Sequence, residues 1–148
     1  MFDDLNDLYQ QVIIDHSKSP RNYGPLPEAN REAHGRNPLC GDDVFVHLKM
    51  DGERIADIHF EGVGCAIAKA SASVMTTALK GKTKPEAEML FARFHELVKT
   101  GRTEGGDLGK LGVFAGVYKF PSRVKCAILC WHAVMSALAG DAHPVTTE

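Results

Sequence analysis

The sequence predicts an α+β fold in which helices cover a small antiparallel three-stranded sheet. Apolar and polar residues alternate over 44–50 and again over 56–60, on either side of an Asp51-Gly52 turn, which is the pattern of a β-hairpin. In this pattern Ala56, Ile58 and Phe60 are expected to face the core. A segment near Ala33 is expected to supply the third strand. Outside these segments, apolar residues recur at the spacing of amphipathic helices.

Four helices are expected around this sheet. The first carries an apolar stripe with His16 at its end and stops before Pro20. The second spans 65–79. The third begins where Thr83 and Glu86 form the pattern of a capping box, and it ends near Gly101. The glycine-rich stretch 101–112 is expected to be a loop before a last helix at about 122–139.

Composition limits the possible functions. The chain has 148 residues, of which 44% are hydrophobic and 24% charged, so we expect a single domain over 1–148. The net charge of −2 lacks the basic footprint of nucleic-acid binding, so no nucleic-acid partner is expected. The N-terminus is acidic where a signal peptide is basic, and no apolar run approaches the roughly 20 residues of a membrane span. We therefore expect no membrane partner and a cytoplasmic location.

The chemistry of the sequence lies in its four cysteines, which in a reducing compartment are more often metal ligands or reactive thiols than disulfides. In NPLCGDD, Asn-Pro and Gly41 predict a tight bend on which Cys40 and Asp42 can converge on one point. A thiolate and a carboxylate both suit zinc. The alternative is a structural turn that carries a half-exposed cysteine.

Two more cysteines are predicted at helix starts. Cys65 follows Gly-Val-Gly and opens the second helix, where free N–H groups favour a thiolate. Cys126 is expected in about the first turn of the last helix, and Arg123 and Lys125 beside it would offset the charge of a site with three thiolates and one carboxylate. Each cysteine could instead be an inert packing residue, but together the three are better explained as a metal-binding cluster.

Cys130 lies one helical turn beyond Cys126. Its apolar neighbours favour a small buried packing residue, and the alternative is an auxiliary thiol that overlooks the site. A disulfide between these two cysteines is disfavoured because side chains at this spacing run nearly parallel. The seven histidines contain no HExxH pair, so a zinc-protease site has no support.

Three motifs resemble the NifU/IscU/SufU family of iron–sulfur cluster biogenesis proteins: NPLCGD at 37–42, FEGVGCAIAKASAS at 60–73 and RVKCAILCWHA at 123–133. The likeness covers nearly the whole chain and implies an α+β fold of the SufE/IscU-like type. The chain is more similar to SufU than to IscU members, because Lys125 replaces the histidine that IscU proteins carry and KFPSR replaces their LPPVK segment. The resemblance implies four metal ligands: Cys40, Asp42, Cys65 and Cys126.

The resemblance to SufU implies a zinc-dependent sulfur acceptor, or sulfurtransferase, that takes persulfide sulfur from a SufS-like cysteine desulfurase for iron–sulfur cluster assembly. Cys40 would be the accepting thiol, and we expect Arg123 to steady the released sulfur by charge. The alternatives are a scaffold that assembles a transient [2Fe–2S] cluster and passes it on, and a purely structural zinc domain. Downstream iron–sulfur scaffolds or apo-proteins would be further partners. Cys130, where the family usually has a small non-thiol residue, and Ala68, in place of a common serine, depart from the family pattern.

Overall fold

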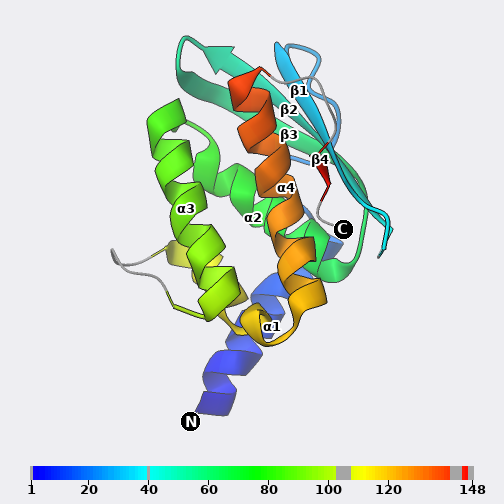
Figure 1. The fold of residues 1–148 in the computed structure, drawn as a ribbon, viewed down its shortest axis with the longest axis vertical. Helices are drawn as coiled ribbons and strands as arrows, with labels where there is room; N and C mark the ends of the chain where they lie inside the picture. The colour runs from blue at the N-terminus through cyan, green and yellow to red at the C-terminus, as the bar shows by residue number, and fades with distance from the viewer. Residues whose placement is uncertain (1, 40, 103–107, 141–144, 147–148) are drawn as a thin grey trace.

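The computed structural model describes residues 2–39, 41–102, 108–140 and 145–146, with side chains over 9–39, 41–102 and 108–140. It contains helices and one sheet in an α+β arrangement (Figure 1). In chain order the elements are α1 (Phe2–Lys18), β1 (Arg31–Asn37), β2 (Asp42–Asp51), β3 (Arg54–Val63), α2 (Ala66–Leu79), α3 (Lys84–Thr100), the 3₁₀ helix η1 (Gly109–Lys119), α4 (Pro121–Ala139) and β4 (Val145–Thr146).

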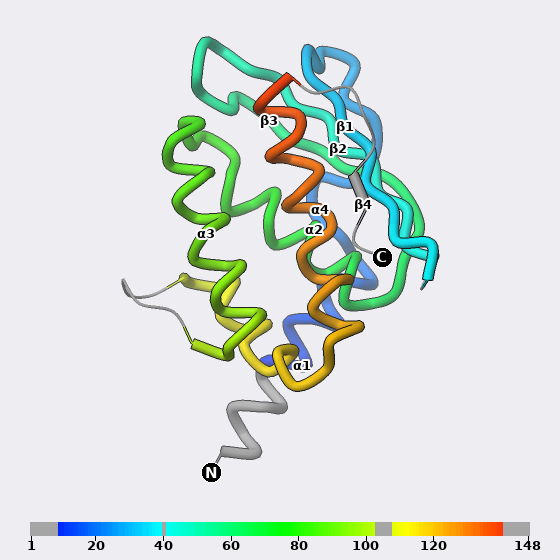
Figure 2. The backbone as a smooth tube through the Cα atoms, in the orientation of Figure 1, coloured from blue at the N-terminus to red at the C-terminus, as the bar shows by residue number. Residues whose placement is uncertain are grey.

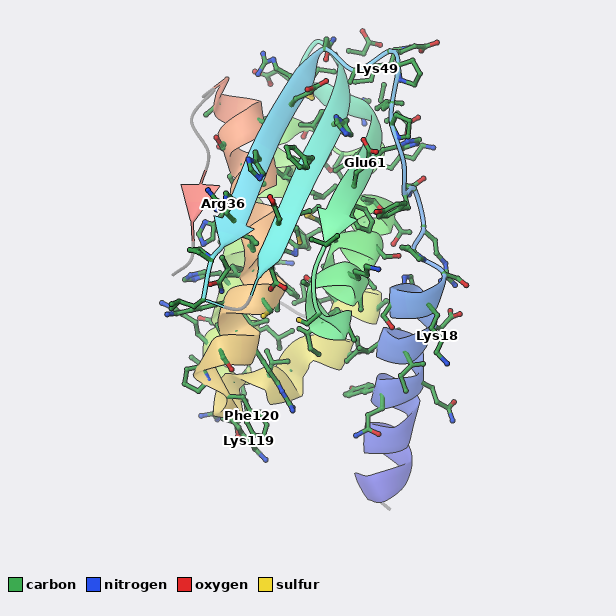
Figure 3. All side chains as sticks on the ribbon, turned by 90° about the vertical axis from the view of Figure 1, so that its right-hand side faces the viewer. Lys18, Arg36, Lys49, Glu61, Lys119 and Phe120 are labelled. Atoms are coloured by element: carbon green, nitrogen blue, oxygen red, sulfur yellow. The ribbon has the colours of Figure 1, made fainter. Side chains whose placement is uncertain are left out.

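The predicted three-stranded antiparallel sheet is confirmed by β1, β2 and β3. The two-residue β4 pairs in parallel with β1 and extends the sheet to the order β3-β2-β1-β4. Helices cover one face of this sheet, and Figure 3 looks onto the other face, on which Glu61 lies. Asn37 pairs with Asp42, so only residues 38–41 connect β1 to β2.

The core lies between the sheet and the helices. Figure 2 shows α2 and α4 packed against the same face of the sheet, although they are far apart in the sequence. Trp131 of α4 is fully buried and stacks on Phe94 of α3, with 4.9 Å between ring centroids. Phe114 of η1 meets Phe94 edge-on at 5.9 Å. This aromatic cluster fixes α3, α4 and η1 against one another.

The prediction for β3 is wrong at one position. Ile55 is buried and Ala56 is exposed, whereas Ile58 and Phe60 face the core as expected. The cause is a β-bulge: the pairing shifts between Lys49 and Met50, so Ala56 is an extra residue without a partner on β2. An extra residue reverses the alternation of inward and outward side chains on one side of the bulge.

The glycine-rich connection is also more structured than predicted. Residues 103–107 lie outside the described residues, but 109–119 form the 3₁₀ helix η1, which was expected to be partly loop. Leu111, Val113, Phe114 and Val117 of η1 are buried. The glycines of this segment hide its short-range apolar pattern, and burial against α3 and α4 stabilises it.

The predicted capping box of α3 is confirmed. Thr83 Oγ1 accepts a hydrogen bond from the Glu86 N–H at 3.3 Å, and Glu86 Oε1 accepts one from the Thr83 N–H at 2.9 Å. The helix ends at Gly101, whose φ of 81° is left-handed. Among the described residues, no helix combines the length and the hydropathy that crossing a membrane would require.

Candidate metal centre

Asp42, the first residue of β2, has an almost fully buried side chain, with 2% of its surface exposed. The bend before it closes when the Gly41 N–H donates to the Asn37 carbonyl at 2.9 Å, and Gly41 adopts a left-handed φ of 78°. Asp42 Oδ1 accepts a hydrogen bond from the Cys65 backbone N–H at 3.0 Å. This bond ties the start of β2 to the start of α2 and fixes the carboxylate.

Cys65 is the N-cap residue of α2, which confirms its predicted place at a helix start. Its Sγ accepts a hydrogen bond from the Ala68 N–H at 3.4 Å, and the residue is exposed. A helix start presents N–H groups and a partial positive charge toward such a sulfur. Cys65 therefore combines access from solvent with donors that stabilise a metal-bound sulfur.

The two glycines before Cys65 allow close approach of the chain to the site. A Cβ on Gly62, whose φ is 133°, would lie 2.0 Å from the Asp43 carbonyl oxygen. A Cβ on Gly64 would lie 3.0 Å from Asp42 Oδ1. The Gly-Val-Gly sequence thus lets β3 and the start of α2 pass closely over Asp42.

Cys126 is buried, with 5% of its surface exposed, and lies on α4. The prediction that it stands in about the first turn, near unpaired N–H groups, is wrong. Helix α4 begins at Pro121, so Cys126 is its sixth residue and lies beyond the first four N–H groups, which alone lack intrahelical acceptors. The helix starts within one residue of the predicted position, so the error lies in the number of residues between that start and Cys126. Cys126 is therefore positioned by burial.

These three side chains converge. One ligand atom each from Asp42, Cys65 and Cys126 lies within 4.8 Å of the others. Ligand atoms at 2.0 to 2.3 Å from a single zinc ion lie within about 4 Å of one another, so a movement of about 1 Å would close the group on a metal. Two thiols and one carboxyl are a donor set that fits zinc and leaves one position of a tetrahedron for a further ligand.

Cys40, the predicted fourth ligand, lies outside the described residues. In the sequence it stands two residues before Asp42, within the short connection 38–41. Its place in the site therefore stays a prediction.

A small crevice of about 20 Å³ adjoins the converging side chains. Asp42, Gly64, Ala68 and Cys126 line it, together with the buried thiol of Cys130. Lys69 of α2 also lines the crevice, and the sequence analysis missed it. Its spacing of four residues from Cys65, which places both on one face of a helix, was the signal that could have identified it.

Cys130 is buried, as interpreted from the sequence, with 2% of its surface exposed. Its Sγ lies 3.7 Å from Ser71 Oγ. Burial raises the pKa of this thiol to about 12, so it is protonated at neutral pH when no metal binds it. Cys126 and Cys130 are not joined by a disulfide in the described part of the chain, as their helical spacing predicted.

Arg123 lies one helical turn before Cys126 and is exposed. Its guanidinium stacks over the Phe120 ring at 4.3 Å from the centroid, and both residues line a larger groove between α1 and η1. Figure 3 labels Lys119, the last residue of η1, and Phe120, the N-cap residue of α4. The contact between Arg123 and Phe120 favours a position of the cation over the ring. The expected role of Arg123 in steadying sulfur stays a prediction.

Comparison with known proteins identifies the family. The family model described as "NifU-like N terminal domain" matches residues 8–127. The chain belongs to this family. The membership inferred from the three motifs is thereby confirmed.

Relatives of this NifU-like chain carry two kinds of name. It is 42% identical over 138 residues to the "Zinc-dependent sulfurtransferase SufU" of Bacillus subtilis, with 93% of each chain covered. It is 41% identical over 140 residues to the "Iron-sulfur cluster assembly scaffold protein IscU" of Streptococcus pyogenes. This alignment covers 94% of this chain and 87% of the relative.

A solved structure shares the fold. It is described as a putative iron–sulfur cluster assembly scaffold protein for the SUF system, FiSufU, from Fervidobacterium islandicum, and it is 35% identical. The TM-score is 0.83, with 90% of this chain and 98% of that chain covered. The predicted fold class is therefore confirmed.

Proposed function

We propose that this chain is a zinc-dependent sulfur acceptor that takes persulfide sulfur from a cysteine desulfurase for iron–sulfur cluster assembly. The observation that carries the proposal is the convergence of Asp42, Cys65 and Cys126 from three separate elements. The name of the Bacillus relative supports the same activity. We further propose that the chain acts as one domain, and that it does so in the cytoplasm.

The proposed metal ligands are Cys40, Asp42, Cys65 and Cys126. Zinc bound there would keep the sulfurs deprotonated and protected. The chain supplies the positioning: the Cys65 N–H holds the Asp42 carboxylate, and burial holds Cys126. Of the four, Cys40 lies on a connection of only four residues that contains a left-handed glycine, so it is the ligand that we propose to leave the site.

We propose that the Cys40 thiolate attacks the outer sulfur of the desulfurase persulfide. The sulfur–sulfur bond of the donor breaks, the donor cysteine leaves as a thiolate, and Cys40 carries the new persulfide. Arg123, held over the Phe120 ring, would steady the negative charge of the transferred sulfur. A downstream iron–sulfur scaffold or apo-protein would then receive it.

The second candidate is a scaffold on which a [2Fe–2S] cluster is assembled. It is favoured by the Streptococcus relative, whose name is that of a scaffold and whose identity is nearly equal. Thiolate ligands suit both zinc and iron–sulfur clusters, so the donor set fits either function.

Metal analysis of freshly purified protein and a desulfurase assay separate the two functions. We expect about one zinc per chain and strong stimulation of sulfide release by a SufS-like desulfurase, with stimulation lost in Cys40→Ser. Anaerobic reconstitution with iron and sulfide, followed by cluster transfer to an apo-acceptor, would favour the scaffold instead. Normal sulfur acceptance by Cys40→Ser would refute the role of Cys40.

A further inference from the structure

The proposed function leaves one thiol beside the site unused. Cys130 lies four residues after Cys126 on α4, and both residues line the crevice that Asp42 also lines. Cys130 is not one of the three residues whose ligand atoms lie within 4.8 Å of one another. A thiol that borders a metal-binding group without belonging to it is a candidate for a second arrangement of that group.

The spacing of the two cysteines suits a shared metal. Side chains four residues apart lie on one face of a helix, and this is the spacing at which two helical ligands bind a single ion in metalloprotease sites. The two residues are about 6 Å apart along the helix axis. An ion placed between the two sulfurs could contact both.

The crevice has room for such an ion. Its volume of about 20 Å³ exceeds the roughly 10 to 15 Å³ that a single water molecule requires. Gly64 and the methyl group of Ala68 bound it and add little bulk. Since Asp42 and Cys126 border both the crevice and the converging group, an ion bound by that group lies beside the crevice that Cys130 lines.

We propose that Cys130 is a reserve metal ligand, which binds the ion when Cys40 leaves it to accept sulfur. This inference rests on the proposed metal site. Cys40 departs as a thiolate, while Cys130 releases its proton to solvent as its sulfur binds, so the number of ligands and the charge of the site are unchanged. The exchange keeps the metal within the chain throughout sulfur transfer.

Cobalt substitution tests this inference because thiolate-to-cobalt charge-transfer absorption grows with the number of bound thiolates. The protein is loaded anaerobically with Co²⁺ alone as wild type, Cys40→Ala and the double variant Cys40→Ala/Cys130→Ser. We expect wild type and Cys40→Ala to show equal intensity, and the double variant to show about two thirds of it, because two thiolates remain of three.

A chelator competition on the same proteins gives a second measurement. The double variant should bind Co²⁺ about tenfold more weakly than Cys40→Ala or worse, since even the loss of a group that supports a ligand costs that much. The matched control is Cys40→Ala/Ser71→Ala, which removes the hydroxyl beside Cys130 but keeps the thiol, and it should retain the three-thiolate spectrum. Circular dichroism checks that each variant is folded.

Each outcome decides a separate question. If Cys40→Ala and the double variant give equal spectra and affinities, Cys130 is not a ligand and the inference is overturned. If wild type shows no thiolate-to-cobalt absorption, the proposed metal site itself fails. Loss of desulfurase stimulation in Cys40→Ala bears only on the proposed function.

Discussion

The candidate metal site and the aromatic core beneath the sheet hold their side chains in different ways. At the site, a strand start, a helix cap and close-packed glycines fix Asp42 and Cys65 through the backbone. In the core, Trp131 and Phe94 are fixed by ring packing. Val63, which lines the crevice beside the site, is an apolar residue that is 67% exposed. The core is fixed by packing, whereas the site combines the buried Asp42 and Cys126 with an exposed Cys65.

The comparison predicts that truncating the core costs the most stability. Trp131→Ala should lower the free energy of unfolding by about 3 to 5 kcal/mol, because it removes a fully buried ring and leaves a cavity between α3 and α4. Denaturant titration followed by circular dichroism measures this loss. A change below about 1 kcal/mol would show that the aromatic cluster does not dominate the core.

Disturbing the backbone at the site should lower the stability less than Trp131→Ala does, but it should reduce metal binding more. Gly62→Ala places a Cβ 2.0 Å from the Asp43 carbonyl at a φ of 133°, so β3 must move away from the start of β2. We expect a loss of about 3 kcal/mol and a reduced zinc content, measured by denaturation and metal analysis.

Gly52→Ala is the matched control for Gly62→Ala. Gly52 also has a left-handed φ, of 64°, but no atom lies within 4 Å of its added Cβ, so we expect a loss of about 1 kcal/mol and full zinc content. Equal effects of the two substitutions on zinc would mean that close approach at Gly62 does not position the site.

Removing the N-cap of α3 should lower the stability by a smaller amount and leave both regions intact. Thr83→Ala removes the hydroxyl that accepts the Glu86 N–H and should destabilise the protein by about 1 kcal/mol. Zinc content should not change, since α3 contributes no residue to the converging group. Thermal unfolding together with metal analysis checks both points, and a reduced zinc content would contradict the separation of the two regions.

The smallest expected effect is a pH dependence from His16, whose Nδ1 lies 2.7 Å from Ser73 Oγ. Burial lowers the pKa of His16 in the folded protein below its value of 6.5 when unfolded. The unfolded chain therefore binds the proton more tightly, so stability falls as the pH drops below about 6.5. Unfolding titrations at pH 5.5 and 7.5 on wild type and His16→Gln should show a smaller pH dependence in the variant. An equal dependence in both would exclude His16 as a source.

Predictions from the sequence held for features that one segment specifies and failed for features that depend on distant segments. Periodicity located α1, α2, α3 and α4 because each helix expresses its own pattern of apolar residues and caps. It failed at Ala56, because a bulge depends on how two strands pair, and at η1, whose order depends on burial against distant helices. The crevice was missed for the same reason, since residues from several separate segments line it.

The sequence by itself determined which residues can bind a metal, where the turn and the helix start that carry Asp42 and Cys65 lie, and which family the chain resembles. The tertiary structure alone decided that Asp42, Cys65 and Cys126 meet, and that Cys130 borders the same crevice. Turns and caps depend on hydrogen bonds among neighbouring residues, which short stretches of sequence specify. The meeting of β2, α2 and α4 depends instead on packing summed over contacts between distant segments, which no local pattern contains.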